Sequence, residues 1–275
     1  MMNSRAPVSV IIPCFCCAST IGRAVKSILS QTVLPAELIL VDDYSNDGGL
    51  TVAELKKIQE QYQNEMKIVV QQMEKNDGPG SSRNLGWSVA TQPYIAFLDA
   101  DDSWHPKKIE IQYGWMKMHP EVVLSGHLSN VLLEEGDLPL TNEASIKQIS
   151  LNSLLLSNCL PTRSVMLKTE VTERFFKGKR QAEDYLLWLQ IALTGAPIFL
   201  IGAPLAFSYK ADFGSAGLNA NLQESLLGVK DTYRKLWLAG QLSIWSYSLY
   251  ITLAYVKHLR RQILVSLRGS KAKWH

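Results

Sequence analysis

The chain has 275 residues, of which 47 % are hydrophobic and 19 % are charged. This composition is typical of a globular protein and excludes disordered, collagen-like and coiled-coil chains. The net charge of +3 is too small to indicate that the whole chain binds nucleic acid. The charge is unevenly placed, because residues 257–275 hold six Lys and Arg and no acid, while residues 1–256 hold 22 basic and 25 acidic groups, a net of −3.

The cysteines and the start of the chain indicate a cytoplasmic protein. Cys14, Cys16 and Cys17 lie close together and Cys159 is distant, so their spacing is unsuited to a disulfide framework. We expect reduced thiols without a metal role. The apolar run Val8–Pro13 is too short for a signal peptide and is stopped by its proline, so we expect no export.

The first part of the chain alternates between short apolar runs and stretches of helical periodicity. The apolar runs are typical of buried strands and cover Val8–Pro13, Glu37–Val41, Ile68–Val70 and Tyr94–Leu98. Helical stretches follow them at residues 21–29, Leu50–Tyr62, Ser81–Ala90 and from Pro106 to near His119. This alternation predicts an α/β fold whose central sheet is mostly parallel and is covered by helices on both faces.

The second half of the chain is less regular. Short strands are predicted at Val122–Gly126, Arg163–Lys168, Pro197–Ile201 and Leu205–Tyr209, and helices at Glu183–Leu193 and Asn219–Ala239. Internal repeats and long linkers are absent from the sequence. We therefore expect one continuous domain followed by a helical C-terminal extension.

Acidic residues follow two of the predicted strands. Asp42 and Asp43 end the second strand, and Asp99, Asp101 and Asp102 follow the fourth. In a parallel sheet the carboxyl ends of the strands meet at the edge where ligands bind, so these carboxylates should converge. Their mutual repulsion falls if Mg²⁺ or Mn²⁺ lies among them, because both ions favour oxygen ligands. The alternative is a simple turn that caps the following helix.

Two further segments leave alternatives open. The glycine-rich turn Gly78–Asn84 enters a helix whose first N–H groups attract phosphate, and Arg83 within it either binds there or pairs with the acidic residues. Glu183 and Asp184 begin another helix, where acids interact favourably with the helix dipole. The catalytic alternative for them is a general base held on a rigid element.

Together these segments resemble a known family. In chain order they are Val8–Phe15, Ser27-x-x-x-Gln31, Asp42–Gly48, Gly80-x-x-Arg83-Asn84, Phe97–Asp102 and Glu183-Asp184-Tyr185-x-x-Trp188. The ordered set is more specific than any one motif. Over about residues 7–210 it resembles the inverting family-two glycosyltransferases with the GT-A fold, of the bacterial polysaccharide-biosynthesis type. The sequence departs from the family at Cys14 and Cys16-Cys17, where polar residues are common.

The resemblance implies a site for a nucleotide-sugar donor, with a UDP-sugar favoured. Pro13 and Phe15 would lie along the nucleotide base, and Asp43 would hydrogen-bond that base. Arg83 would lie beside the nucleotide. Trp188 would either shape the acceptor side or pack in the core.

The resemblance also implies a role for each of the acidic residues. Asp99 and Asp101 would form the Asp-x-Asp motif that contacts the ribose and a Mn²⁺ or Mg²⁺ ion, and Asp102 would supply a further metal ligand. Asp184 would be the general base, with Glu183 as its substitute. The implied reaction is transfer of the sugar to a hydroxyl of a glycan or lipid-linked acceptor.

This reading divides the chain into a glycosyltransferase domain and an extension. The domain would cover residues 1–215, with a nucleotide-sugar half at about 7–105 and an acceptor half at about 106–215, and the extension would cover 216–275. The competing hypothesis is a non-catalytic subunit that binds nucleotide sugars. A phosphatase using Asp99 and Asp101 would need a downstream lysine that the sequence does not clearly offer.

The extension contains an uncharged run with a basic tail. Leu236–Val256 has no charged residue in 21 positions and is rich in Trp and Tyr. Its length could span a bilayer, but polar residues dilute it. Aromatic and basic residues together favour the surface of an anionic membrane, so we expect a cytoplasmic protein that is peripheral on the inner membrane. Packing on the catalytic domain or on a partner is a second alternative, and a true span of the bilayer is a third.

Overall fold

The computed structural model describes residues 5–132, 145–209 and 221–271. Its strands are β1 (Ala6–Cys14), β2 (Pro35–Asp42), β3 (Lys67–Gln72), β4 (Tyr94–Phe97), β5 (Ser103–Trp104), β6 (Leu124–Val131), β7 (Ile146–Gln148), β8 (Met166–Lys168) and β9 (Ile198–Ser208). Its helices are α1 (Ile21–Leu29), α2 (Leu50–Tyr62), α3 (Pro79–Val89), α4 (Lys108–Met118), α5 (Leu151–Leu156), α6 (Glu183–Leu193), α7 (Leu222–Leu238) and α8 (Ile244–Lys271), with a 3₁₀ turn η1 (Thr162–Ser164).

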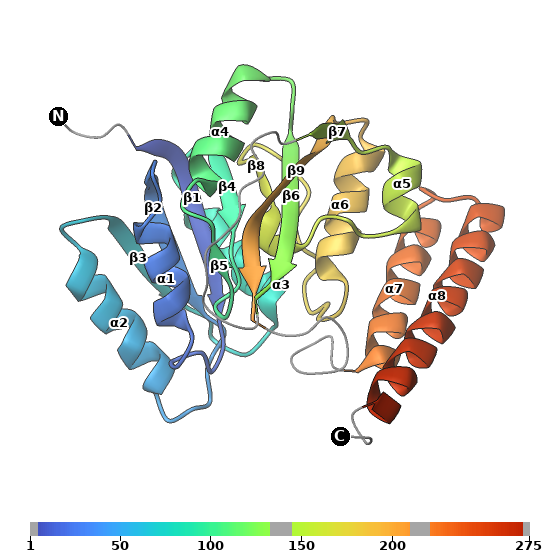
Figure 1. Cartoon of the computed structure of the whole chain (residues 1–275), viewed down its shortest axis with the longest axis horizontal. Coiled ribbons are helices and arrows are strands. Elements are labelled where there is room, and N and C mark those ends of the chain that lie inside the picture. The colour runs from blue at the N-terminus through green and yellow to red at the C-terminus, as the bar shows by residue number, and fades with distance from the viewer. Residues whose placement is uncertain (1–4, 133–144, 210–220, 272–275) are drawn as a thin grey trace.

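The described strands form one central sheet flanked by helices (Figure 1). Their order is β3-β2-β1-β4-β8-β6-β9-β5, with β7 paired to β9. The half of the sheet that contains β1 is parallel, as the sequence predicts. Strand β1 pairs in parallel with β2 and with β4, and β2 pairs in parallel with β3. The side of β9 is mixed, since β8 runs antiparallel to β4 and β6 while β6 and β9 are parallel.

The helices bury both faces of the parallel strands. Successive side chains of β1 point to opposite faces. Val10 and Ile12 belong to a core that includes residues of α1, α2 and α4, whereas Ile11 belongs to a second core with residues of α3 and α6. Burial on both faces explains why β1 reads as an unbroken apolar run.

The predicted elements are confirmed where the apolar residues repeat with a clear helical or strand period. The helices at Leu50–Tyr62 and Glu183–Leu193 have the predicted bounds. The strand predicted at Arg163–Lys168 instead contains η1 and then β8. Helix α5 and the short strands β5 and β7 were not predicted.

The prediction of two short strands at Pro197–Ile201 and Leu205–Tyr209 is wrong. These residues form the single strand β9. Its register against β6 shifts between His127 and Ser129, so the strand continues through an irregularity. Pro204 lies at that irregularity, and in the sequence it resembles a strand end.

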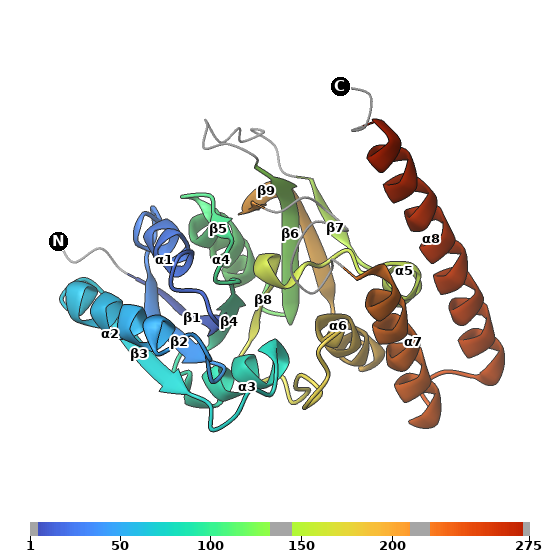
Figure 2. The same ribbon diagram turned by 90° about the horizontal axis from the view of Figure 1, so that it is seen from below.

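Helices α7 and α8 pack against each other and are joined by a short turn (Figures 1 and 2). Gly240 in this turn has a φ of +70°, and it divides the uncharged run Leu236–Val256 between the two helices. Within the described ranges, no helix is long and apolar enough to cross a membrane. The expected domain boundary at 215/216 lies outside the described residues.

Candidate active site

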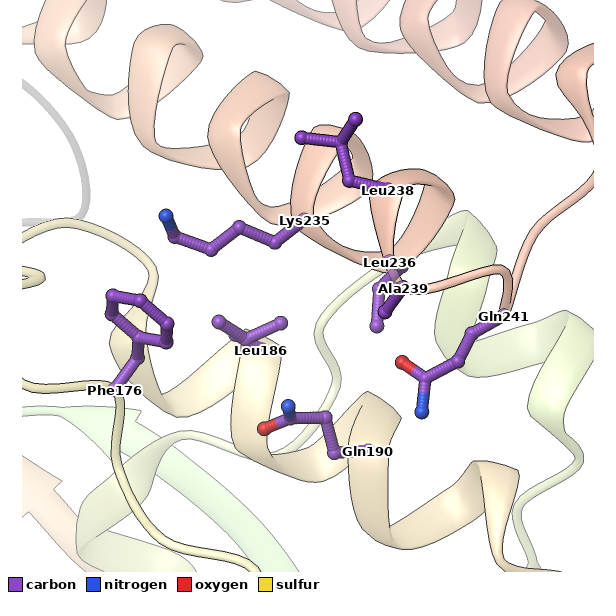
Figure 3. Close-up of a pocket in the computed structure, with 8 residues that line it drawn as sticks. All are labelled: Phe176, Leu186, Gln190, Lys235, Leu236, Leu238, Ala239 and Gln241. Atoms are coloured by element: carbon purple, nitrogen blue, oxygen red, sulfur yellow. The ribbon is translucent and has the colours of Figure 1, made fainter.

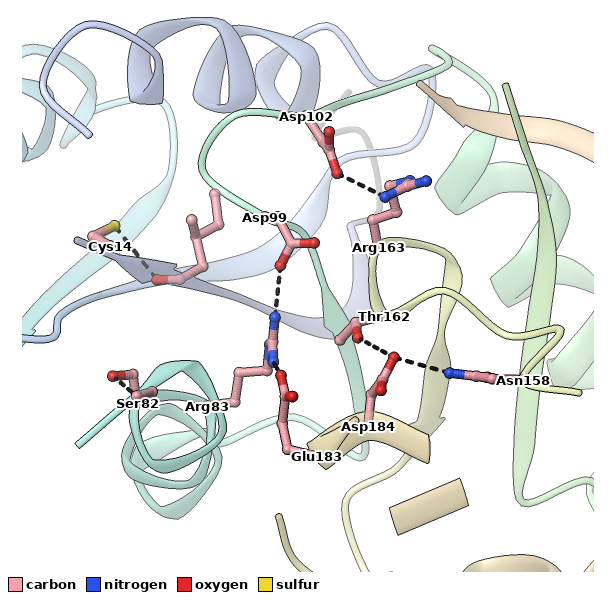
Figure 4. A network of polar contacts seen from close by, with 12 residues as sticks. Cys14, Ser82, Arg83, Asp99, Asp102, Asn158, Thr162, Arg163, Glu183 and Asp184 are labelled. Atoms are coloured by element: carbon pink, nitrogen blue, oxygen red, sulfur yellow. Dashed lines mark hydrogen bonds and ion pairs between the residues drawn. The ribbon is translucent and has the colours of Figure 1, made fainter. Parts of the chain in front are cut away.

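Acidic side chains from separate segments meet around one arginine near the carboxyl ends of β1 and β4 (Figure 4). Arg83, on α3, is 4 % exposed and donates from Nη2 to Oδ1 of Asp99 at 2.6 Å and from Nη1 to Oε1 of Glu183 at 3.0 Å. Burial lowers the pKa of Arg83, but the charges of Asp99 and Glu183 outweigh this effect and raise it. Arg83 therefore pairs with two of the acidic residues, and its place beside a nucleotide stays a prediction.

Asp184 lies half-buried in the first turn of α6 and accepts three hydrogen bonds. Its Oδ1 accepts the backbone N–H of Tyr185 at 2.6 Å. Its Oδ2 accepts from Oγ1 of Thr162 at 3.1 Å and from Nδ2 of Asn158 at 3.2 Å. Ala182, directly before the helix, has a left-handed backbone with φ of +53°, an unfavourable conformation for a residue other than glycine.

The two carboxylates at this helix start have raised pKa values. Burial, with a further contribution from the charge of Asp184, raises the pKa of Glu183 to about 7, although Arg83 opposes the shift. Burial likewise raises the pKa of Asp184, while Arg83 and the three hydrogen bonds lower it. The protein environment therefore disfavours the charged form of both carboxyls and increases their affinity for a proton.

The turn after β4 carries the Asp-x-Asp motif. Asp102 is 3 % exposed, and its Oδ2 lies 3.3 Å from Nη1 of Arg163. Arg23, on α1, donates from Nη2 to the backbone oxygen of Asp101 at 2.6 Å and lies over the ring of Tyr209. Two arginines from distant segments therefore hold this turn in place.

The chemistry of this turn fits a divalent cation. Burial and the charge of Asp99, with a smaller contribution from Asp101, raise the pKa of Asp102 to about 7 against the effect of Arg163, so the turn concentrates negative charge. In the parts of the chain that the structure describes, no group of three or more His, Cys, Asp or Glu side chains is arranged to hold a metal. Mg²⁺ needs no such group where one or two carboxylates are completed by substrate phosphates.

The residues predicted for the nucleotide base lie at the ends of β1 and β2. Phe15 is 48 % exposed just beyond β1, and Pro13 is half-buried. Asp43 is buried, and its two oxygens accept the backbone N–H groups of Asp77 at 3.0 Å and Gly78 at 2.9 Å. Asp43 thus fixes the turn that leads into α3 and Arg83.

The expectation that Trp188 shapes the acceptor side is corrected by its burial. The side chain is 0 % exposed and its Nε1 donates to the backbone oxygen of Leu160 at 3.0 Å. Its ring packs against those of Phe97 and Phe175. Without exposed surface it has no access to an acceptor, so the core-packing alternative holds.

Among the residues beside the acidic groups that sequence reasoning missed are Asn158, Thr162 and Arg163. They lie in the segment between α5 and β8, which has no period and no motif. Only the fold brings this segment beside α6 and the turn after β4, so the sequence offered no signal for it.

A separate cavity lies between α6 and α7 (Figure 3). It has a volume of about 230 Å³ and is lined by Phe176, Leu186, Gln190, Lys235, Leu236, Leu238, Ala239 and Gln241. None of these is one of the clustered acidic residues, so this cavity is not the site described above.

Comparison with known sequences identifies relatives. The model of the family described as glycosyl transferase family 2 matches residues 9–167, more than half of the chain. A UDP-Glc:alpha-D-GlcNAc-diphosphoundecaprenol beta-1,3-glucosyltransferase, WfgD, of Escherichia coli is 29 % identical over 191 residues, which cover 67 % of this chain and 69 % of that protein. A glycosyltransferase of Nostoc sp. is 32 % identical over 178 residues, which cover 62 % of this chain but 53 % of that protein, so the chain spans only about half of that relative.

Comparison with solved structures shows the fold. S. aureus TarS 1–349 in complex with UDP-GlcNAc has a TM-score of 0.67 at 20 % identity, over 89 % of this chain and 70 % of that chain. The mannosyltransferase PcManGT of Pyrobaculum calidifontis in complex with GDP-Man and Mn²⁺ has a TM-score of 0.65 at 16 % identity, over 98 % of this chain and 81 % of that chain. These similarities establish the GT-A fold.

Proposed function

Since the chain belongs to glycosyl transferase family 2, we propose that it moves a sugar from a UDP-sugar to a hydroxyl of a glycan or lipid-linked acceptor, with inversion at the anomeric carbon. The observation that carries this proposal is the meeting of Asp99, Glu183 and Asp184 with Arg83 near the carboxyl ends of the strands. The relative WfgD is named for a UDP-Glc donor and a diphosphoundecaprenol acceptor, which supports both substrate classes.

Asp184 is the proposed general base. In the reaction one of its carboxylate oxygens accepts the proton of the acceptor hydroxyl. The hydroxyl oxygen forms a bond to the anomeric carbon from the face opposite the diphosphate, and the breaking bond leaves its electron pair on the diphosphate. A single displacement of this kind inverts the configuration and needs no covalent enzyme intermediate. Glu183, which is paired with Arg83, is the less favoured candidate for the base.

Asp101 and Asp102 are the proposed ligands of Mn²⁺ or Mg²⁺, and Asp99 is assigned to the ribose. A bound divalent cation would offset the charge that develops on the departing diphosphate. PcManGT, which shares the fold, is described as a complex with Mn²⁺, and this supports a divalent cation as the cofactor. Asp101 is half-exposed while Asp102 is buried, so Asp101 is the more accessible of the two carboxylates.

Pro13, Phe15 and Asp43 are proposed to line the base of the nucleotide. An exposed aromatic ring at a strand end offers a stacking surface for a base, and Phe15 has this exposure. Asp43 is already bonded to two backbone N–H groups, so its role includes holding the α3 turn against the donor. Arg83 orders the acidic side chains around that donor.

We further propose that residues 216–275 attach the domain of residues 1–215 to an anionic membrane on the cytoplasmic side. The inner face of α8, which includes Tyr247, Tyr250, Ile251 and Ala254, packs on the core. The opposite face is apolar and exposed, with Trp245 at 83 %, Leu249 at 56 %, Val256 at 59 %, Leu259 at 59 % and Ile263 at 52 %. No Asp or Glu follows Asp231 in the sequence, so the charged groups beside this face are basic.

The donor is tested by thermal unfolding in a panel of nucleotide sugars with and without Mn²⁺. A UDP-sugar at about 100 times its Kd should raise the Tm by about 5–10 °C in the presence of Mn²⁺ and by much less with EDTA. The donor that stabilises the protein is then supplied with a lipid-linked acceptor, and glycosylated product is measured. Asp101→Asn should weaken the response to Mn²⁺.

The outcomes separate the two hypotheses for function. Transfer, or metal-dependent hydrolysis of the donor in the absence of acceptor, supports the enzyme. Donor binding with neither transfer nor hydrolysis across lipid-linked and free glycan acceptors would indicate the non-catalytic subunit. Stabilisation by another nucleotide sugar but by no UDP-sugar would overturn the donor assignment alone.

A further inference from the structure

The segment from Asn158 to Ser164 crosses the site between α5 and β8 and contacts acidic groups on both of its sides (Figure 4). Asn158 and Thr162 donate to Oδ2 of Asp184, at 3.2 and 3.1 Å. The next residue, Arg163, points the other way, and its Nη1 lies 3.3 Å from Oδ2 of Asp102. Consecutive residues of one short segment therefore join the first turn of α6 to the turn after β4.

The segment is itself fixed to the core. Nε1 of Trp188 donates to the backbone oxygen of Leu160 at 3.0 Å, and Nε1 of Trp104 donates to that of Arg163 at 2.8 Å. Nε2 of Gln112 donates to the backbone oxygen of Ser164 at 2.9 Å. Three buried side chains from α6, β5 and α4 thus hold the backbone of the segment, and Trp188 is one of the three.

We propose that residues 158–164 form a positioning strap in which Asn158 and Thr162 orient the carboxylate of Asp184 and favour its charged form, while Arg163 fixes its place relative to Asp102. This inference rests on the proposed function, because it assigns the strap a role through the proposed base. Donors that bond a carboxylate favour its ionised state, and two of them on one oxygen also restrict the rotation of the side chain.

The charges around Asp184 give the direction of the effect. Arg83 on α3 lowers the pKa of Asp184, and Glu183 on the same helix is the neighbouring acid whose own pKa is raised by the charge of Asp184. Burial raises the pKa of Asp184, and Arg83, the N–H of Tyr185, Thr162 and Asn158 oppose that rise. Removing either side-chain donor leaves the effect of burial less opposed, so the pKa should increase.

The test is the pH dependence of kcat in the full-length protein. Thr162→Val should move the acid limb of the profile upward by about one pH unit, because a hydrogen bond to a charged group is lost. Thr162→Ser keeps the hydroxyl and should restore the wild-type profile. Thr172→Val is the matched control, because Thr172 is exposed and its hydroxyl donates to the carboxylate of the neighbouring Glu173 and not to the site.

Asn158 provides an independent variant because its side chain is exposed, although its Oδ1 also accepts the backbone N–H of Leu160 at 3.2 Å. Asn158→Ala should also move the acid limb upward, and Asn158→Asp should move it further because the new charge repels that of Asp184. Asn152→Ala, at an exposed position of α5, should leave the profile unchanged. Donor affinity, measured by titration with the UDP-sugar, should stay within about twofold of wild type in all of these variants.

The result that overturns the strap is a uniform fall in kcat with an unchanged profile in both Thr162→Val and Asn158→Ala. Superposition of the Thr162→Ser and Thr162→Val profiles would overturn it equally. If Thr162→Val does not fold, the Asn158 variants decide. Absence of transfer by the wild-type protein is a failure of the proposed function, and it is recognised before any variant is compared.

Discussion

Glu183 and Asp184 are adjacent acids whose charges affect each other, and Arg83 binds only the first of them directly. Both are in the first turn of α6, where the helix dipole favours negative charge. Burial nevertheless raises both pKa values, and that of Glu183 reaches about 7. Because two adjacent negative charges repel each other, ionisation of one carboxyl disfavours ionisation of the other. The pH dependence of transfer should report this coupling.

Glu183→Gln should move the acid limb of kcat to lower pH. The substitution removes the neighbouring negative charge, so the pKa of Asp184 falls and the base stays deprotonated in more acidic solution. In the wild-type protein the rate should fall as the pH drops through the raised pKa, because the base is then protonated. The loss of a like charge on the adjacent residue should shift the acid limb by about half to one pH unit.

The matched control for this prediction is Glu170→Gln, because the side chain of Glu170 is 79 % exposed and its nearest cation is 3.6 Å away. Its profile should overlay that of the wild type. An acid limb that stays in place or moves to higher pH in Glu183→Gln would show that the two carboxylates do not share a titration.

At the scale of elements, α3 packs so closely on the sheet that it has no room for a side chain at Gly86. A Cβ added there would lie 2.5 Å from Cγ2 of Ile11 on β1 and 3.3 Å from Cγ2 of Val41 on β2. This close contact fixes the distance between α3 and the sheet, and therefore the position of Arg83 on that helix. Gly114 in α4 is the contrasting case, because a Cβ added there meets nothing within 4 Å.

Gly86→Ala should lower the free energy of unfolding by about 1–3 kcal/mol, because the added methyl group forces strand and helix apart. Gly114→Ala should raise it by up to about 1 kcal/mol, because alanine has the better helix propensity and finds open space. Urea unfolding monitored by circular dichroism measures both. Equal stability of the two variants would contradict the close packing of α3 on β1.

Elements with a strong local period were predictable, and those defined by distant partners were not. Helix α2 is amphipathic in the sequence, whereas β5 has two residues and exists only through its pairing with β9. In the site, Asp43, Asp99, Asp101 and Asp102 were predictable because they follow strands, whereas Glu183 and Asp184 begin a helix and only the family resemblance linked them to the other acids. Asn158 and Thr162 were not, because they contact Asp184 from 26 and 22 positions away and only the fold brings them there. Trp188 lies on α6 like Asp184, and only packing decides that it points inward.

At the scale of the molecule, the carboxyl ends of β1, β6 and β9 and the C-terminal end of α8 lie at the same end, at the bottom of Figure 1. Figure 2 shows that α8 extends beyond α7 at this end. The outer face of α8 points away from α7 and from the sheet, so a membrane in contact with it would lie along this edge of the molecule.

The full-length protein should sediment with vesicles that contain anionic phospholipid and much less with neutral vesicles. Trp245→Ser with Leu249→Ser should reduce binding at least about tenfold, because each large apolar side chain contributes roughly 1.5–3 kcal/mol when buried. High salt should also weaken binding, because it screens the basic residues. Both effects follow from the exposed apolar face and the absence of acids on α8.

Met118→Ser is the control for this assay, because Met118 is an apolar side chain on α4 that is 75 % exposed. Its loss should leave vesicle binding unchanged. If the double variant sediments with vesicles as the wild type does, α8 does not contact the membrane. If the wild type does not bind anionic vesicles, the proposal of membrane attachment is wrong.

The most direct measurement compares transfer and donor binding in wild type and Asp184→Asn. The amide has the shape of the carboxylate but does not accept the proton, so transfer should fall by about 10²–10⁴-fold while the Kd for the donor stays within about twofold. Undiminished transfer by Asp184→Asn would contradict the assignment of this residue as the base and, with it, the central claim that the meeting point of these acidic side chains is where the sugar is moved.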